Sequence, residues 1–363
     1  MACGEPPAPR EVEPEPASEV ASVAAGAASA PELHPARRCG ECHESYLTEW
    51  SGSAHAGSDR SPVYQAMRAA APEAAACDRC HAPLAAVLGR ADPLAGEGVN
   101  CDVCHALAAV ELGPASASWS LELADNRKYG PLCDAAEPYF HRAGCSPLHG
   151  ESRLCAACHH LNAPLPVFSE FAEWQHGEAM SSGVQCQGCH MGKRAGAVAS
   201  GGPERRMVSQ HGDGPAPGDG LQLTASAVAV PGGVELRGAL KVSGVGHSVP
   251  AGLPGRELAL VAELVDGTGQ VTASAELVYS KQLVDGAGRE VPFFAATRVG
   301  ADTRLRAEET RSFALGLAGA GVGAVLRLVE RPLSRELARG LGLELPAREL
   351  ELRRFAAPWE PAP

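Results

Sequence analysis

Five copies of one short pattern contain ten of the thirteen cysteines in this 363-residue chain. Each copy reads Cys-x-x-Cys-His, a pattern typical of covalent attachment of c-type haem. Two thiols three residues apart on a helical turn can each form a thioether with one vinyl group of a porphyrin. The histidine that follows can then ligate the iron as its proximal ligand. The copies are Cys39-x-x-Cys42-His43, Cys77-x-x-Cys80-His81, Cys101-x-x-Cys104-His105, Cys155-x-x-Cys158-His159 and Cys186-x-x-Cys189-His190.

A single copy of this pattern could also belong to a zinc site or to a disulfide. A zinc-ribbon or disulfide scaffold is therefore the alternative interpretation. Five copies that use most of the cysteines favour haem. The sequence predicts five covalently bound haem c groups, with His43, His81, His105, His159 and His190 as the proximal iron ligands.

Eight further histidines are available for the second side of each iron, and five suffice if every iron is held by two imidazoles. Bis-histidine ligation usually gives lower reduction potentials than histidine–methionine ligation. His55 lies only twelve residues beyond His43, so we expect it to serve a neighbouring haem. The distal candidates, in order of preference, are His55, His247, His211, His149 and His141, then His160 and His176, with His34 last.

The first three motifs carry a family resemblance. Cys39-x-x-Cys42-His43 is followed by Trp50 and by Ser53-Ala-His55-Ala56, and a Gly98-Val99-Asn100 approach precedes Cys101. In these features residues 38–190 resemble the cytochrome c-554 family of multihaem electron carriers. The namesake carrier has four haem motifs, whereas this chain has five, so its ligand assignments do not transfer as a set. The resemblance also implies that one haem can be five-coordinate.

Composition and charge limit the remaining possibilities. Aromatic residues make up only 4 % of the chain, and porphyrins would supply the apolar volume that is missing from an ordinary core. The formal charge of −12 makes nucleic acid and anionic membrane surfaces poor partners and favours a positively charged redox protein.

Residues 1–32 are rich in Pro, Glu and Ala and predict a disordered tether. Covalent haem attachment occurs outside the cytoplasm, so we expect an exported protein in the periplasm or at the outer surface. Cys3 resembles the lipidated cysteine of a lipoprotein, and an incidental cysteine in a tail is the alternative. No apolar run reaches the length of a membrane helix.

The predicted haem domain spans residues 33–215 and is expected to be mainly helical or irregular. For residues 216–363 the sequence predicts an antiparallel β-sandwich of the immunoglobulin-like kind. Period-two runs begin at Leu221 and continue to Arg354, with a short helix near 333–341. A Gly- and Pro-rich loop around His247 resembles loops of sandwich domains fused to multihaem cytochromes, and this resemblance implies that His247 completes a haem of the N-terminal half. Residues 193–220 predict a loop or linker, and Cys133 and Cys145 predict a disulfide, with two free thiols as the alternative.

These features favour a non-enzymatic electron-transfer protein that works with redox partner proteins. The alternative is a multihaem oxidoreductase that acts on a small nitrogen or sulfur compound at a five-coordinate haem. In a third interpretation, the sandwich is an adhesion or docking module and the haems exchange electrons with whatever it binds.

Overall fold

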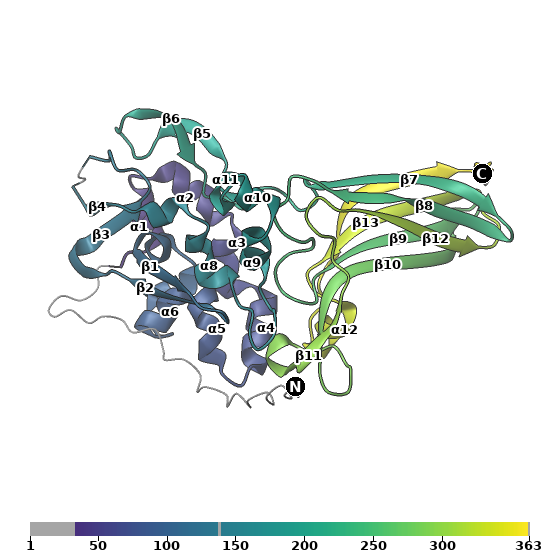
Figure 1. Cartoon of the computed structure of the whole chain (residues 1–363), viewed down its shortest axis with the longest axis horizontal. Coiled ribbons are helices and arrows are strands. Elements are labelled where there is room, and N and C mark those ends of the chain that lie inside the picture. The colour runs from purple at the N-terminus through teal and green to yellow at the C-terminus, as the bar shows by residue number, and fades with distance from the viewer. Residues whose placement is uncertain (1–32, 137–138, 362–363) are drawn as a thin grey trace, which may run out of the picture.

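The computed structural model describes residues 33–136 and 139–361 (Figure 1). The predicted tether at 1–32, including Cys3, lies outside the described residues. Helices occupy the N-terminal part and long strands the C-terminal part, as expected (Figure 1). No helix in the described ranges is long and apolar enough to cross a membrane.

The helices of the N-terminal part are short, and most haem motifs coincide with a helix end. The second and fourth motifs form the C-terminal ends of α5 and α8, and the third and fifth motifs form the whole of α7 and α11. The first motif begins in α1 and extends beyond its end. The helices are α1 Ala36–Gly40, α2 Glu44–Ser51, α3 Ala54–Gly57, α4 Pro62–Ala70, α5 Ala74–His81, α6 Pro83–Leu88, α7 Cys101–His105, α8 Arg153–His159, α9 Glu170–Gln175, α10 Glu178–Ser181 and α11 Cys186–His190.

Three two-stranded sheets interrupt these helices, and the sequence analysis did not anticipate them. They pair β1 Leu107–Leu112 with β2 Ala117–Leu121, β3 Arg127–Gly130 with β4 Arg142–Cys145, and β5 Lys193–Ala197 with β6 Glu204–Ser209. The prediction of a plain loop or linker over 193–220 is therefore wrong for β5 and β6. Those strands contain too few buried side chains for a period-two pattern to be visible in the sequence.

The strands predicted after Leu221 are confirmed, and the structure adds the short β11. One antiparallel sheet has the order β11-β10-β9-β13-β14, and a second has the order β12-β8-β7. Their bounds are β7 Leu221–Val230, β8 Gly233–Val242, β9 Glu257–Val265, β10 Val271–Val284, β11 Arg298–Asp302, β12 Thr310–Ala318, β13 Gly323–Arg331 and β14 Arg348–Ala356, with the short helix α12 at Arg335–Gly340. The immunoglobulin-like topology stays a prediction.

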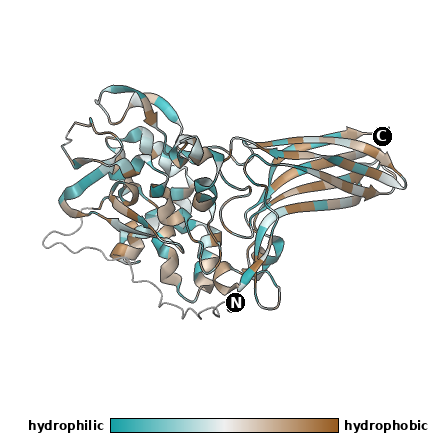
Figure 2. Ribbon diagram, viewed as in Figure 1, coloured by the Kyte–Doolittle hydropathy of each residue, from teal (hydrophilic) through white to brown (hydrophobic). Residues whose placement is uncertain are grey.

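The two sheets enclose the largest hydrophobic core of the described residues. Leu236 and Leu240 of one sheet and Leu260 and Leu326 of the other are fully buried in it. Figure 2 shows the corresponding alternation of hydrophobic and hydrophilic residues along these strands. Burial of apolar side chains between sheets accounts for the stability of this half without any cofactor.

The apolar clusters of the N-terminal part are much smaller. One contains Leu107, Val110, Ala117, Trp119 and Leu148, and another contains only three alanines. That porphyrins complete the core of this half stays a prediction. A third cluster joins the two halves, because Met67 of α4 packs against Leu333 and Leu337 at α12.

Charged groups also cross between the halves. Lys281 of β10 is 4 % exposed, and its Nζ donates to the backbone O of Pro166 (2.9 Å) and to Ser169 Oγ (2.8 Å). Arg304 Nη2 donates to Glu173 Oε1 at 2.8 Å. Burial by itself would raise the pKa of Glu173, but bonds from Ser169 and from the Ser248 N–H, together with Arg304, lower it to about 2. Glu170, Lys281 and Asp302 are the other charged groups nearby.

This arrangement predicts an acid-dependent contribution to stability. Because the folded-state pKa of Glu173 lies below the ordinary 4.5, its contribution is complete above pH 4.5 and is lost as the pH falls from 4.5 towards 2. The unfolding temperature of the full chain should therefore drop on Glu173→Gln at about pH 6, and this drop should shrink at about pH 3. An equal effect of the substitution at both pH values would contradict the assignment.

Candidate haem-binding site

Two parts of the sequence that carried the family resemblance touch in the structure. The Val99 N–H donates to the backbone O of His55 at 3.0 Å, and Trp50 Nε1 donates to the backbone O of Val99 at 2.9 Å. Gly98 has φ +66°, and a Cβ there would lie 2.5 Å from the His55 carbonyl oxygen. Glycine is needed for this close approach. Asn100 then caps α7 through its side chain, which accepts the Val103 N–H. These contacts fix His55 relative to the third motif.

Four of the five proximal histidines face a second histidine from elsewhere in the chain. Each of these pairs has ring centroids separated by a nearly constant distance. The pairs are His43–His141 at 6.3 Å, His159–His55 at 6.4 Å, His105–His211 at 6.2 Å and His190–His247 at 6.2 Å.

This spacing fits an iron between the rings. Metal–imidazole bonds of about 2 Å, with each ring centroid roughly 1 Å beyond its nitrogen, place two centroids roughly 6 Å apart. Aromatic pairs in general have ring centroids about 4.5–7 Å apart, so the distinctive feature is the nearly constant distance across four pairs. The histidine pairs are therefore spaced as ligands of one metal would be.

Hydrogen bonds leave Nε2 available on several of these rings. The Nδ1 atoms of His43 and His105 lie 2.8 and 2.5 Å from the backbone O of Val198 and Tyr129. The Nδ1 atoms of the distal candidates His141, His211 and His247 likewise face nearby carbonyl oxygens. An Nδ1–H that donates to a carbonyl sets the tautomer and orients the ring of a metal-bound histidine.

The remaining distal candidates are oriented differently. His149 lies 5.8 Å from the His105 ring, but its Nε2 faces the backbone O of Cys104 at 2.9 Å. His160 uses Nε2 towards Gly113 O and Nδ1 towards Asn162. His176 is exposed, and its Nδ1 faces Ala172 O. At His34, the backbone N–H donates to Asp102.

Burial also favours neutral imidazoles. It lowers the pKa of His55, His81, His141, His190 and His211, and that of His105 to about 4. Iron binds the neutral ring, so these histidines are in the required protonation state near neutral pH.

His81 differs from the other proximal histidines. Among the described residues, which include every histidine, no second imidazole makes a ring contact with it. Instead the ring of Tyr64 stacks on His81 with centroids 4.5 Å apart. The hydroxyl of Tyr64 donates to Asp78 Oδ1 at 2.6 Å.

Sequence reasoning missed the charged network behind this tyrosine. Asp78 is buried and accepts from Arg68 and Arg90, and Arg90 also bonds Asp59. Burial opposes ionisation of Asp78, but the bonds from Arg68 and Arg90 keep its pKa well below the usual range. The only sequence signal was Asp78 itself, between the two cysteines of the second motif.

The thiols of different motifs lie next to one another. Cys39 interacts with Cys101, Cys80 with Cys158 and Cys155 with Cys186, and each interaction shifts the pKa of the thiols involved. Cys104 of the third motif also interacts with Cys155 and Cys158. The five motifs therefore form one contiguous set, in which the first adjoins the third, the third adjoins the fourth, and the fourth adjoins the second and fifth.

The chemistry of the donor set fits haem better than the alternatives. All ten motif cysteines are free of disulfides, and no three His, Cys, Asp or Glu side chains in the described ranges converge to hold a metal ion by themselves. Two buried N–H donors near the second and fourth motifs, Arg79 Nε and Trp119 Nε1, lack a partner among the described residues. A carboxylate such as a haem propionate would satisfy such donors.

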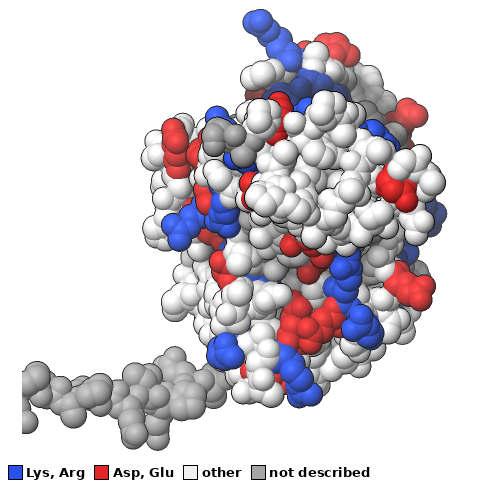
Figure 3. Space-filling model, turned by 90° about the vertical axis from the view of Figure 1, so that its right-hand side faces the viewer, with Lys and Arg blue, Asp and Glu red and all other residues white. Residues whose placement is uncertain are grey.

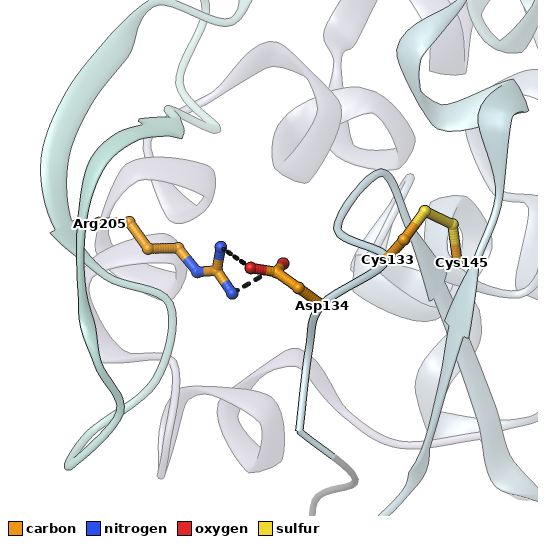
Figure 4. Close-up of a disulfide and its surroundings, with 4 residues drawn as sticks. All are labelled: Cys133, Asp134, Cys145 and Arg205. Atoms are coloured by element: carbon orange, nitrogen blue, oxygen red, sulfur yellow. Dashed lines mark hydrogen bonds and ion pairs between the residues drawn. A yellow bond between two sulfur atoms is a disulfide. The ribbon is translucent and has the colours of Figure 1, made fainter.

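The predicted disulfide between Cys133 and Cys145 is present (Figure 4). It closes the segment that carries His141. Next to it, Asp134 forms an ion pair with Arg205 of β6 at 3.0 Å (Figure 4). The parallel pairing of β3 with β4 also holds this segment in place. The backbone O of Tyr129 in β3 faces Nδ1 of His105. One small unit thus positions His141, which faces His43 of the first motif, and His105 of the third motif.

The motifs and the fold resemble those of a multihaem c-type cytochrome, with a β-rich C-terminal part. Residues 38–106 match the family model described as cytochrome c554 and c-prime, which confirms the resemblance there. The match includes three of the five motifs and supports covalently bound haem c. No curated protein matches the chain.

One solved structure has the same overall fold. It is a penta-heme cytochrome c552 from Thermochromatium tepidum, with 21% sequence identity and a TM-score of 0.70, and the alignment covers 88% of this chain and 98% of that chain. A second solved structure, that of the ApaA protein from Bordetella pertussis, has 12% sequence identity and a TM-score of only 0.21. The alignment covers 38% of this chain and 94% of that chain.

The disulfide generates a prediction about His141. Removing the cross-link from a loop of this size costs roughly 3 kcal/mol in the chain-entropy model. The double variant Cys133→Ser/Cys145→Ser should unfold at a lower temperature and should lose low-spin character at one haem. Asp134→Asn, which removes only the exposed ion pair, is the control and should change neither property measurably. A double variant with an unchanged spin state would show that β3 and β4 suffice to hold His141.

Proposed function

We propose that this chain is a pentahaem c-type cytochrome that carries electrons between redox partner proteins outside the cytoplasm. The four histidine pairs at 6.2–6.4 Å carry this proposal, because that spacing suits two axial ligands of one iron. The five motifs would each supply two thioether sulfurs and one proximal imidazole.

We assign the distal ligands from the same geometry. His141 serves the first motif, His211 the third, His55 the fourth and His247 the fifth. His149 and His160 are not assigned as ligands, because their Nε2 atoms bond backbone carbonyls. His149 instead supports the carbonyl of Cys104 within the third motif.

Haem c, when bound, supplies a one-electron iron couple at each motif. The chain's own residues would set the reduction potential of each couple through imidazole orientation, burial and hydrogen bonding. The contiguity of the five motifs supports transfer within the protein, since a thiol of each motif interacts electrostatically with a thiol of another motif.

The partners follow from charge. The formal charge of −12 favours a redox protein with a positive face. Figure 3 shows one end of the molecule, where acidic and basic residues are interspersed around an uncharged area. That face has no single-sign field to steer a partner. We place the protein in the periplasm or at the outer surface, where Cys3 would serve as a lipid attachment site.

Single substitutions test the ligand assignment. Each of His55→Ala, His141→Ala, His211→Ala and His247→Ala should convert one haem from low spin to high spin in the oxidised full chain, as counted by electron paramagnetic resonance. His149→Ala and His160→Ala are matched controls and should leave the count unchanged. A spin change in the controls, or none in the four variants, would contradict the assignment.

A second candidate function rests on His81. His81 has no paired imidazole among the described residues, so a haem held by the second motif would have one imidazole ligand and a sixth position open to a small molecule. Tyr64 stacks on His81 and is itself hydrogen-bonded to Asp78 and Arg90. This network therefore orients the imidazole ring of His81. An open position of this kind suits reduction of a small nitrogen or sulfur compound.

Carbon monoxide provides a probe of this open position. The reduced wild-type chain should bind one equivalent of carbon monoxide, and the oxidised chain should show one high-spin haem. Turnover of nitrite, hydroxylamine or sulfite with an electron donor would then support an enzyme. Binding of no carbon monoxide would remove the second candidate and leave the electron carrier intact.

A further inference from the structure

The loop that carries His247 is attached to the helical half on both sides of this histidine. Before it, Gly246 lies so close to α9 and α10 that a Cβ would come within 3.2 Å of Ala179 Cβ and 3.4 Å of Trp174. After it, the Ser248 N–H donates to Glu173 Oε2 at 2.8 Å. The Gly252 N–H donates to Glu170 Oε1 at 2.5 Å.

Glu173 is itself held by groups from both halves. Its Oε1 accepts from Ser169 Oγ at 2.6 Å within the helical half and from Arg304 Nη2 at 2.8 Å of the C-terminal half. Ser169 Oγ in turn accepts from Lys281 Nζ at 2.8 Å. Arg304 is further fixed by Asp302. Glu173 therefore connects two buried cations of one half to the backbone amide next to His247.

A carboxylate with this set of donors has little freedom to move, because all four donors converge on its two oxygens or on the serine that bonds it. The backbone N–H of Ser248 can reach only one of these oxygens, and that bond sets the position of the peptide following His247. The His247 ring then lies 6.2 Å from His190, with the two ring planes inclined by 18°.

We propose that Glu173 is the positioning residue that holds His247 opposite His190. Docking of the C-terminal half and completion of the ligand pair at the fifth motif are then one event. The inference rests on the proposed function, because it requires His247 to be an iron ligand. It adds that a side chain without any contact to the haem iron controls whether that ligand is in place.

Spin counting on the full-length haem-loaded chain tests the proposal. Glu173→Ala removes the acceptor of the Ser248 N–H and should raise the high-spin count above wild type, by up to the one equivalent expected for His247→Ala. Glu173→Gln keeps an acceptor and should give a smaller rise. Glu178→Ala on the neighbouring α10, whose side chain is exposed, is the matched control and should match wild type.

A double substitution separates positioning from a general loss of stability. Because Glu173 acts through His247, Glu173→Ala/His247→Ala should show no more high-spin haem than His247→Ala alone. An additive double variant would mean that Glu173 acts at another haem, and an unchanged spin count in Glu173→Ala would mean that it positions nothing. Either result overturns the inference.

Two further outcomes remain interpretable. If Glu173→Ala does not accumulate, Glu173→Gln and Arg304→Lys provide the same comparison, and both must raise the high-spin count for the inference to stand. If His247→Ala itself leaves the count at the wild-type value, the proposed ligand set fails, independently of what Glu173 does.

Discussion

The spacing of paired imidazoles is the constraint on which the helical half of this protein depends. Four proximal histidines face a second ring at 6.2–6.4 Å, and each distal ring comes from a distant part of the chain. An iron between the two rings of each pair would bind both sides. Haem insertion and folding would then be coupled, since each iron would join two segments that have few apolar contacts of their own. The small clusters around Trp119 and Ala82 agree with this dependence.

The C-terminal half follows a different physical principle. Its two sheets bury a continuous apolar core and need no cofactor. This half contributes one side chain to the histidine pairs, His247, together with the cations Lys281 and Arg304 that meet residues of the helical half. The two-sheet part thus places a histidine opposite His190 that the helical half does not supply itself.

Much of this organisation could be predicted from the sequence. Period-two alternation located the strands from Leu221 onward, because half-buried strands in a two-sheet core leave that pattern. The C-x-x-C-H spacing predicts the thioether cysteines and the proximal histidines, because thioether geometry requires closely spaced thiols, and this assignment stays a prediction. The glycine- and proline-rich loop around His247 also appeared as an unusual element between strands.

Pairing could not be predicted in the same way. Both His149 and His211 lie near His105, and which of them keeps Nε2 available depends on which nitrogen a neighbouring carbonyl takes, a choice that no local pattern encodes. The strands β5 and β6 were missed because their alternation is short and interrupted by glycines. The network around Asp78 was missed because Arg68, Arg90 and Tyr64 become neighbours only when α4 and α5 pack together.

The intact mass of the full chain, produced in a host that attaches haem c, tests the central claim most directly. The account predicts a single folded species that carries five covalent haem additions, one for each C-x-x-C-H motif. A folded chain with fewer additions, or with motif cysteines recovered as free thiols or disulfides, would contradict it.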